Sequence, residues 1–272
     1  MNELIVLLPA FNEEENLESL VHSWQTFRKG LAEGYGLALH IVVVNDGSGD
    51  KTPKIGEALA YRYDNVTLLS HQRNCGLGQA LKTGIFHVLR QHPDGAFVCL
   101  MDCDNTHHPK YVLDMLDKQQ ATAADVVIAS RYEEGAEVYG LSAFRRFLSE
   151  AARSVYTLLL HVDQVRDYTC GYRLYRAEAL RKAYDRFGED LVEERGFSCM
   201  AELLYKLYSC GAVFAEVPFD LRYDLKGGAS KMKVIQTVVN SMKLVARLKG
   251  IVKQGSAPYG RKSNPTTREK VL

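Results

Sequence analysis

The sequence predicts an α/β fold with a mostly parallel sheet and helices on both of its faces. The first observation is that short apolar runs, typical of buried strands, alternate with helical stretches through the first half of the chain. These runs cover residues 4–8, 40–44, 66–70, 96–101 and 125–129. The second observation is that polar clusters follow most of these strands, and open parallel sheets bind their ligands where the strands end.

The helical stretches between these strands cover about residues 14–29, 52–61, 78–89 and 111–120. In the second half we expect helices at 143–160 and 199–209, a polar turn at 167–171 before an apolar patch at 172–175, and a strand at 213–217. A last helix over 233–252 is predicted because apolar residues from Val234 to Leu248 recur at helical spacing, with basic residues elsewhere on the wheel. The predicted organisation is therefore an α/β domain over 1–232, a basic amphipathic helix over 233–252 and a flexible basic tail over 253–272.

Cysteine usage and hydropathy indicate the kind of compartment in which the protein works. The six cysteines form no C-x-x-C pair, so we expect reduced thiols with no disulfide framework and no zinc site. No stretch approaches the roughly 18–20 continuous apolar residues of a membrane span, and the first strand begins without a basic, signal-like segment before it. We expect a cytoplasmic protein.

The formal net charge of +1 hides an asymmetry along the chain. From Lys226 to the end there are eleven lysines and arginines but only one acid, Glu269, so the preceding residues are net acidic. A basic segment on an acidic body indicates a polyanionic partner, either an anionic lipid surface or a nucleic acid. The alternative is a solvated tail, which the glycine-, serine- and proline-containing sequence after about Gln254 favours.

The most informative polar cluster is Asp102-Cys103-Asp104, which follows the strand at 96–101. Two carboxylates one residue apart repel each other, and a divalent cation relieves that repulsion. Hard oxygen ligands suit Mg²⁺ or Mn²⁺, and these ions in turn bind diphosphates. A solvated turn is the other interpretation of such a pair, and the remaining clusters decide between the two.

Two further clusters can hold a nucleoside or merely cap a helix. After the first strand, Phe11 and Glu13 offer a flat apolar surface and a carboxylate, whereas Asn12 can cap the next helix. After the second strand, Asp46 can accept hydrogen bonds from a ribose or base, and Asp50 is expected to be structural. The glycines at 76 and 78 indicate a helix start with close backbone packing, since the third glycine of a dinucleotide-binding loop is missing.

Three arginines near the same sheet edge can pair with phosphate, namely Arg131, Arg145 and Arg146. Arg145 and Ser149, four residues apart, share one face of the predicted helix. His107 and His108 follow the paired aspartates, but a His-His-Pro sequence before a helix indicates packing and capping. We assign them no catalytic role.

In their order and spacing these motifs resemble glycosyltransferase family 2, and within it the dolichol-phosphate mannosyltransferases. The similarity rests on Leu-Pro-Ala-Phe-Asn-Glu (8–13), Val-Asn-Asp-Gly-Ser (44–48), Gly-Leu-Gly-Gln-Ala (76–80), Met-Asp-Cys-Asp-Asn-Thr-His-His-Pro (101–109), Ser-Arg-Tyr (130–132), Arg-Arg-Phe-Leu-Ser (145–149), Thr-Cys-Gly-Tyr-Arg-Leu-Tyr-Arg (169–176), Glu-Val-Pro (216–218) and Ser-Lys (230–231). It covers about residues 4–232.

The resemblance implies a GT-A, Rossmann-like fold and the inverting transfer of a hexose, mannose from GDP-mannose, to a polyprenyl or dolichyl phosphate with Mg²⁺ or Mn²⁺. The implied nucleoside contacts are Pro9, Phe11, Glu13, Val44 and Asp46. The implied metal ligands are Asp102 and Asp104, with Cys103 alongside the diphosphate, and Arg131, Arg145 and Ser149 would bind the acceptor phosphate. Lys231 would close over the donor diphosphate, which makes Asp102, Asp104, Arg131 and Lys231 the expected catalytic set.

The sequence departs from the family pattern at three places. Asn45 stands where the family usually has Asp, Phe11 replaces the usual Tyr, and the arginine expected shortly before the Ser-Lys is absent. Either Arg222 or Lys226 can take that arginine's role. A lipid phosphate is already anionic and needs no general base, whereas a hydroxyl acceptor needs one, for which Glu202 and Asp167 are candidates.

The basic helix over 233–252 has two interpretations. It can lie on a membrane with its apolar stripe facing the lipid, as a peripheral protein on a cytoplasmic face would require, or the stripe can pack on the protein itself. Rival functions are transfer from another donor of the UDP-glucose type, a non-polyprenyl acceptor, a nucleotidyltransferase or a nucleic-acid binder. The last leaves the paired aspartates unexplained, so we expect no nucleic-acid partner.

Overall fold

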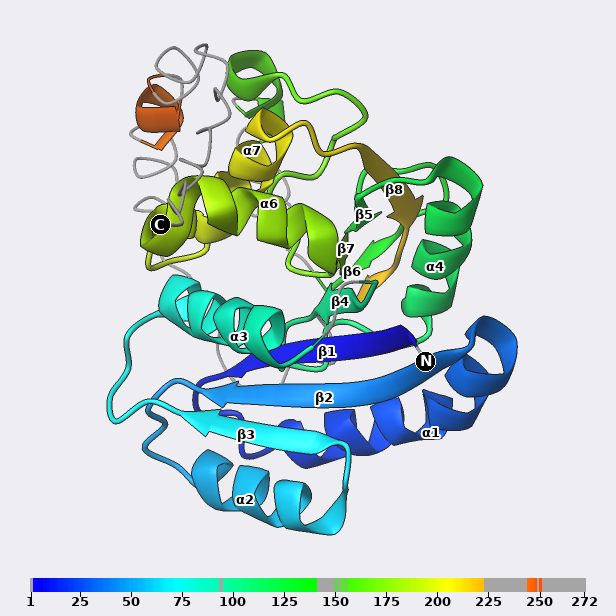
Figure 1. Ribbon diagram of the computed structural model, residues 1–272, viewed down its shortest axis with the longest axis vertical. Helices are drawn as coiled ribbons and strands as arrows, with labels where there is room; N and C mark the ends of the chain where they lie inside the picture. The colour runs from blue at the N-terminus through cyan, green and yellow to red at the C-terminus, as the bar shows by residue number, and fades with distance from the viewer. Residues whose placement is uncertain are drawn as a thin grey trace, which may run out of the picture.

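The computed structural model describes residues 2–92, 95–140, 150, 153–154, 156–222, 244–248 and 250. In this part of the chain a seven-stranded sheet has the order β3-β2-β1-β4-β7-β5-β8 (Figure 1). Its strands are β1 (Asn2–Ala10), β2 (Leu37–Asn45), β3 (Val66–Ser70), β4 (Phe97–Leu100), β5 (Val126–Ser130), β7 (Arg173–Arg176) and β8 (Phe214–Pro218). A second, two-stranded sheet pairs β6 (Val138–Tyr139) with β9 (Leu221–Arg222).

Most of the sheet is parallel, as the sequence predicts. β1 pairs in parallel with β2 and β4, β2 with β3, and β5 with β8. β7 is the exception, because it runs antiparallel to both β4 and β5. The apolar patch at 172–175 marks this strand in the sequence, but its direction depends on tertiary pairing, which a short apolar run does not encode.

Helices cover both faces of the sheet. α1 (Leu17–Tyr35) and α2 (Thr52–Arg62) lie together on one side of β1–β3, and α3 (Leu77–Gln91) lies on the other (Figure 1). α3 packs beside α6 (Ala177–Phe187) and α7 (Cys199–Ser209), whereas α4 (Tyr111–Thr122) packs against β5 and β8. α6 is an addition to the helices expected from the sequence, and its buried residues are Ala177, Ala179, Leu180 and Ala183.

The strand order places a change of chain direction between β1 and β4. The chain runs outward from β1 through β2 to β3 and then returns to β4 on the other side of β1. Open α/β sheets bind ligands outside the carboxyl ends of the strands at such a point. The segments that follow β1, β2 and β4 are those that the sequence singles out.

Three residues of the predicted last helix pack on the protein itself. Leu244, Val245 and Leu248 are buried and belong to the hydrophobic core cluster. Val245 and Leu248, the stripe residues among them, therefore pack on the body of the protein, as the second interpretation of the helix expects. The other stripe residues lie outside the described part of the chain. Within the described residues, no helix is long and apolar enough to cross a membrane.

Candidate active site

The segments that follow β1 and β2 are joined by hydrogen bonds into one wall. The backbone N–H of Asn12 donates to Ser48 Oγ at 3.0 Å, and the backbone N–H of Gly49 donates back to Asn12 Oδ1 at 2.9 Å. The backbone N–H of Glu13 donates to Thr52 Oγ1 at 2.8 Å. Asn12 adopts a positive φ of 54°, a conformation that Asn tolerates better than most residues. The residues predicted to hold a nucleoside therefore lie on a cross-linked surface.

Asp46 is held in place at the end of β2 by three donors. Its Oδ1 lies 2.7 Å from His71 Nδ1 and accepts the backbone N–H of Cys75 at 2.9 Å, and its Oδ2 accepts the backbone N–H of Gly76 at 2.8 Å. The other imidazole nitrogen, Nε2, lies 2.9 Å from Thr83 Oγ1 on α3. Because Asp46 is buried and held by these three contacts, the orientation of its carboxylate is fixed.

The glycines at the start of α3 allow an unusually close backbone contact. A Cβ on Gly78 would lie 1.7 Å from the carbonyl oxygen of Glu194, and one on Gly76 would lie 2.6 Å from that of Arg195. Gly76 also has a positive φ of 95°. The prediction of a helix start with close packing is confirmed, and the loop that packs on it is the one containing residues 194 and 195.

The paired aspartates follow β4 and are supported from two sides. A Cβ on Gly171 would lie 2.7 Å from Asp102 Oδ1, so the carboxylate sits directly against the turn at 167–171. Asp104 Oδ1 accepts the hydroxyl of Thr106 at 2.5 Å and its backbone N–H at 3.2 Å. Both aspartates are partly exposed, whereas Cys103 between them is buried.

Asn105 ties the aspartate loop to the segment after β1. Its side-chain amide donates to Asn16 Oδ1 at 3.0 Å and to Ser19 Oγ at 3.2 Å, and Asn105 has a positive φ of 57°. Asn16 in turn donates to Glu13 Oε2 at 2.8 Å. The structure therefore brings together the three strand-end clusters that the sequence identifies, after β1, β2 and β4.

The donor set of the aspartate loop fits a hard divalent cation. Asp102 and Asp104 present carboxylate oxygens, which are the ligands that Mg²⁺ and Mn²⁺ prefer. A second group, made of Asp46, His71 and Cys75, also brings three possible ligand atoms within 4.8 Å of one another. In that group the Asp46 carboxylate already accepts the backbone N–H groups of Cys75 and Gly76.

Arg131 forms a buried ion pair with Asp167. Its Nε donates to Asp167 Oδ2 at 2.8 Å, and its Nη2 donates to Asp167 Oδ1 at 2.7 Å and to Thr169 Oγ1 at 2.8 Å. Burial would raise the pKa of Asp167, but the charge and hydrogen bonds of Arg131 outweigh it and lower that pKa. The same turn at 167–171 thus holds Arg131 at one end and, through Gly171, contacts Asp102 at the other.

Glu216 on β8 fixes the start of this turn through hydrogen bonds to its backbone. Its Oε1 accepts the backbone N–H groups of Arg166 and Asp167, both at 2.8 Å. Burial raises the pKa of Glu216, although these two hydrogen bonds oppose the shift. Glu216 belongs to the Glu-Val-Pro motif, and its contacts give that motif a positioning role.

The two carboxylates considered as a general base are both structural anchors. Glu202 on α7 is fully buried, and its Oε1 accepts Lys206 Nζ at 2.8 Å and Arg247 Nη2 at 2.9 Å. Its Oε2 accepts the backbone N–H groups of Glu193 and Glu194. Asp167 is equally buried and paired with Arg131. A base must reach an acceptor proton, and these contacts keep both carboxylates within the protein.

Two guanidinium groups lie over the ring of Tyr132. The Arg131 Cζ lies 5.5 Å and the Arg153 Cζ 4.8 Å from the ring centroid of Tyr132, so one ring collects two cations after β5. Arg153 also pairs with Glu150 at 2.8 Å. Sequence reasoning missed Arg153, although it lies four residues after Ser149 on the same helical spacing as Arg145.

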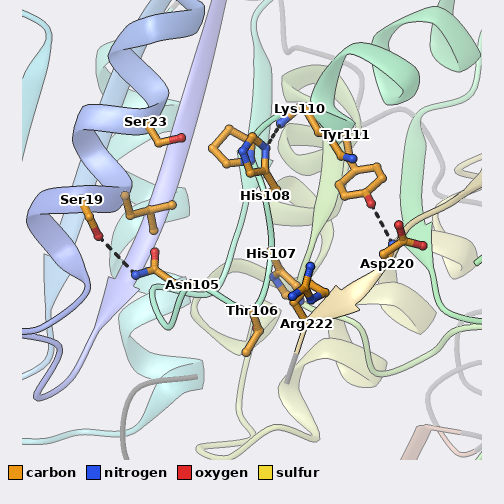
Figure 2. Close-up of a pocket in the computed structure, with 12 residues that line it drawn as sticks. Ser19, Ser23, Asn105, Thr106, His107, His108, Lys110, Tyr111, Asp220 and Arg222 are labelled. Carbon is orange, nitrogen blue, oxygen red and sulfur yellow. Dashed lines mark hydrogen bonds between the residues drawn. The ribbon is translucent and has the colours of Figure 1, made fainter. Parts of the chain in front are cut away.

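A cavity of about 450 Å³ lies behind the aspartate loop, between α1 and the start of α4. Figure 2 shows Ser19 and Ser23 of α1 on one side of it, the loop from Asn105 to Tyr111 across from them, and Asp220 with Arg222 at the far side. Among the predicted donor contacts that the structure describes, only Arg222 lines this cavity, and its guanidinium carbon lies 5.2 Å from the Tyr139 ring centroid.

The two histidines of this loop pack and cap, as predicted. His107 is buried and stacks on Tyr172, with ring centroids 5.5 Å apart. His108 Nδ1 accepts the backbone N–H of Lys110 at 3.0 Å, at the start of α4.

Other predicted site residues fall into two groups. Val44 is fully buried between β1 and β3, so its side chain is part of the core. Arg145, Ser149, Lys226 and Lys231 lie outside the described residues.

Sequence reasoning did not identify His71 or the contact between Gly171 and Asp102, because both arise from segments far apart in the chain.

Comparison with known proteins agrees with this geometry. The mostly parallel sheet, with carboxylates at the strand ends, is the arrangement expected of a GT-A fold. The family model of glycosyl transferase family 2 matches residues 5–183. The chain belongs to glycosyl transferase family 2 and is a hexosyltransferase.

Two relatives have names that refer to a lipid phosphate. The chain is 33% identical over 230 residues to polyprenol monophosphomannose synthase of Mycolicibacterium smegmatis, covering 84% of this chain and 80% of that protein. It is 29% identical over 237 residues to dolichyl-phosphate beta-glucosyltransferase ALG5A of Trichomonas vaginalis, covering 85% and 68% respectively.

Solved structures share the fold at lower identity. Glucosyl-3-phosphoglycerate synthase of Mycobacterium tuberculosis, solved with Mn²⁺, UDP and its product, has a TM-score of 0.64 at 19% identity, over 92% of this chain and 80% of that one. TarS 1–349 of S. aureus with UDP has a TM-score of 0.55 at 17% identity, over 90% and 65%. These likenesses support the GT-A fold prediction.

Proposed function

We propose that this protein transfers a hexose, mannose from GDP-mannose, to a polyprenyl or dolichyl phosphate with inversion at the anomeric carbon. The observation that carries the proposal is the turn at 167–171, which contacts Asp102 through Gly171 and pairs with Arg131 through Asp167. A carboxylate suited to a metal–diphosphate and a guanidinium suited to a phosphate are thereby supported by one rigid segment. The 33% identical polyprenol monophosphomannose synthase supports the choice of sugar and acceptor.

The donor nucleoside would lie against the cross-linked wall formed by the segments after β1 and β2. Phe11 would stack on the base, Asp46 would accept a hydrogen bond from the ribose or base, and Pro9 and Glu13 would complete the wall. The diphosphate would lie next to Asp102, Cys103 and Asp104. Lys231 and either Arg222 or Lys226 supply positive charge over it.

Asp102 and Asp104 would hold the Mg²⁺ or Mn²⁺ ion, which supplies charge neutralisation for the nucleoside diphosphate as it leaves. The acceptor phosphate would be oriented by Arg131, Arg145 and Ser149. Asp167 fixes the orientation of the Arg131 guanidinium through Nε and Nη2. The phosphate oxygen attacks the anomeric carbon without a general base, in keeping with the anchoring roles of Glu202 and Asp167.

A second donor class has its own support. The relative from Trichomonas vaginalis is named a glucosyltransferase, and the structural neighbours bind UDP or UDP-linked sugars. A UDP-glucose donor with a lipid phosphate acceptor is therefore the alternative for this site. In either case the acceptor is a membrane lipid, so the protein would work at a membrane surface, on its cytoplasmic face and as a peripheral protein.

A competition assay separates these possibilities. The purified protein is incubated with vesicles containing polyprenyl phosphate, Mn²⁺ and equal concentrations of GDP-mannose and UDP-glucose, each with a different sugar label. We expect the mannose label to enter the lipid fraction. Glucose label in the lipid would replace the donor assignment, and labelled free sugar without labelled lipid would overturn the acceptor assignment. Vesicles that lack polyprenyl phosphate provide the control.

A further inference from the structure

The C-terminal helical segment is fastened to the protein by an ion-pair cluster around Glu202. Arg247 Nη2 donates to Glu202 Oε1 at 2.9 Å and to Glu194 Oε1 at 3.0 Å. Lys206 Nζ contacts the same Glu202 Oε1 at 2.8 Å and Glu193 Oε2 at 3.0 Å. Leu244, Val245 and Leu248 are buried beside it, so charge and apolar packing fix the segment together.

The cluster also sets the backbone of the loop at 193–195. Glu202 Oε2 accepts the backbone N–H of Glu193 at 3.0 Å and that of Glu194 at 2.8 Å. One buried carboxylate therefore binds the loop by one oxygen and the cations by the other. Removal of Arg247 would leave the buried Glu202 carboxylate with Lys206 as its remaining cationic partner among the described residues and would weaken its hold on the loop.

The loop in turn lies directly on the start of α3. The backbone N–H of Gly78 donates to the carbonyl of Arg195 at 3.1 Å, and the Glu194 carbonyl occupies the space of a Gly78 side chain. Two residues earlier, the backbone N–H of Gly76 donates to Asp46 Oδ2 at 2.8 Å. A continuous series of short contacts thus connects Arg247 with Asp46.

We propose that Arg247 is a positioning residue for the donor site: it fixes the loop at 193–195, which holds the start of α3 and thereby the orientation of Asp46. The proposal rests on the nucleoside-binding role of Asp46 in the proposed function. Arg247 lies on the helical segment at 244–248 and neither the sequence motifs nor the buried core predict a role for it in donor binding. It acts through other residues and touches no substrate.

The test combines Arg247→Ala, Arg247→Lys and a matched control, Arg28→Gln, which breaks the exposed Arg28–Asp64 pair far along the sequence from this cluster. Hydrogen exchange of the ligand-free full chain is measured for the amides of Glu193, Glu194 and Gly78. We expect faster exchange at all three in Arg247→Ala, slower exchange again in Arg247→Lys, and no change in Arg28→Gln. Unchanged exchange in Arg247→Ala would overturn the proposal.

Kinetics and binding supply the second readout. In Arg247→Ala the KM for the donor, and the Kd for GDP or UDP alone, should rise on the order of tenfold, with kcat within about twofold, because positioning of a ground-state contact is lost. Arg247→Lys should restore part of the affinity. A fall in kcat with unchanged KM and Kd would contradict the proposal.

The exchange data distinguish failure of the proposed function from failure of the positioning role of Arg247. If the wild-type protein transfers no sugar and binds no nucleotide, the proposed function fails, whereas the exchange data still decide whether Arg247 controls the loop.

If Arg247→Ala does not fold, Glu194→Gln provides the second variant, since it weakens the contact with Arg247 and keeps the backbone N–H that Glu202 binds. Donor affinity unchanged in Glu194→Gln, together with unchanged exchange at Gly78, would overturn the proposal.

Discussion

The Arg131 guanidinium donates two hydrogen bonds to the buried carboxylate of Asp167, at 2.8 and 2.7 Å. The pair joins the end of β5 to the turn at 167–171, which also contacts Asp102. Removing one member leaves the other charge buried without its partner. This relationship leads to the first two predictions.

Asp167→Asn should destabilise the protein by about 3–5 kcal/mol, because breaking a buried ion pair leaves the Arg131 charge uncompensated. Urea unfolding followed by circular dichroism measures the change. Asp64→Asn is the matched control, since it breaks the exposed pair with Arg28 and should leave the unfolding midpoint almost unchanged. Equal midpoints for the two variants would show that the buried pair contributes little.

The same pair predicts an acid-dependent loss of stability. Arg131 lowers the pKa of Asp167 in the folded protein below the ordinary value of 3.8, so the pair contributes fully above that value. As the pH falls below it, the unfolded chain takes up the proton first, and stability declines until the folded pKa is reached. Below about pH 4 the unfolding free energy of Asp167→Asn should therefore fall less steeply with acid than that of the wild type. Parallel slopes would contradict the lowered pKa.

Gly171→Ala should lower the transfer rate on the order of 10- to 100-fold, because its Cβ would lie 2.7 Å from Asp102 Oδ1 and displace that carboxylate. Steady-state kinetics with varied Mn²⁺ measure the effect, and the concentration of Mn²⁺ for half-maximal rate should rise. Gly49→Ala is the control, since a Cβ there meets nothing within 4 Å. Wild-type kinetics in Gly171→Ala would mean that Asp102 takes no part in the reaction.

Glu202→Gln distinguishes an anchor from a general base. As an anchor, Glu202 binds Lys206, Arg247 and the loop at 193–194, so the variant should lose stability and donor affinity while the shape of the pH–rate profile is retained. Denaturant unfolding and the pH dependence of kcat are measured together. A folded variant of wild-type stability that has lost an ionisation from the kcat profile would identify Glu202 as the base instead.

The sequence predicts the parts of this fold that depend on local pattern. The strand-end position of Asp102 and Asp104 follows from an apolar run and the polar residues after it, and the structure confirms both the strand and the loop. α7 begins and ends where its pattern predicts, at Cys199 and Ser209. Asp50 is structural, as expected, because it accepts the backbone N–H of Thr52.

What the sequence does not predict depends on partners far apart in the chain. Asp46 reads as a ligand contact in the sequence, but the imidazole of His71 that restrains it comes from the next strand–helix connection. Glu202 can be read as a base until Lys206 and Arg247 are seen around it. The antiparallel direction of β7 likewise depends on which strands lie beside it.

The central claim is that Asp102 and Asp104 hold the metal of a sugar-nucleotide donor whose sugar passes to a lipid phosphate. The most direct measurement is transfer of labelled mannose from GDP-mannose to polyprenyl phosphate in vesicles, with Mn²⁺ or with EDTA, by the wild type and by Asp104→Ala. We predict labelled lipid only for the wild type with Mn²⁺, with a rate at least about 100-fold lower in Asp104→Ala. Full activity of Asp104→Ala, or equal transfer in EDTA, would contradict the claim.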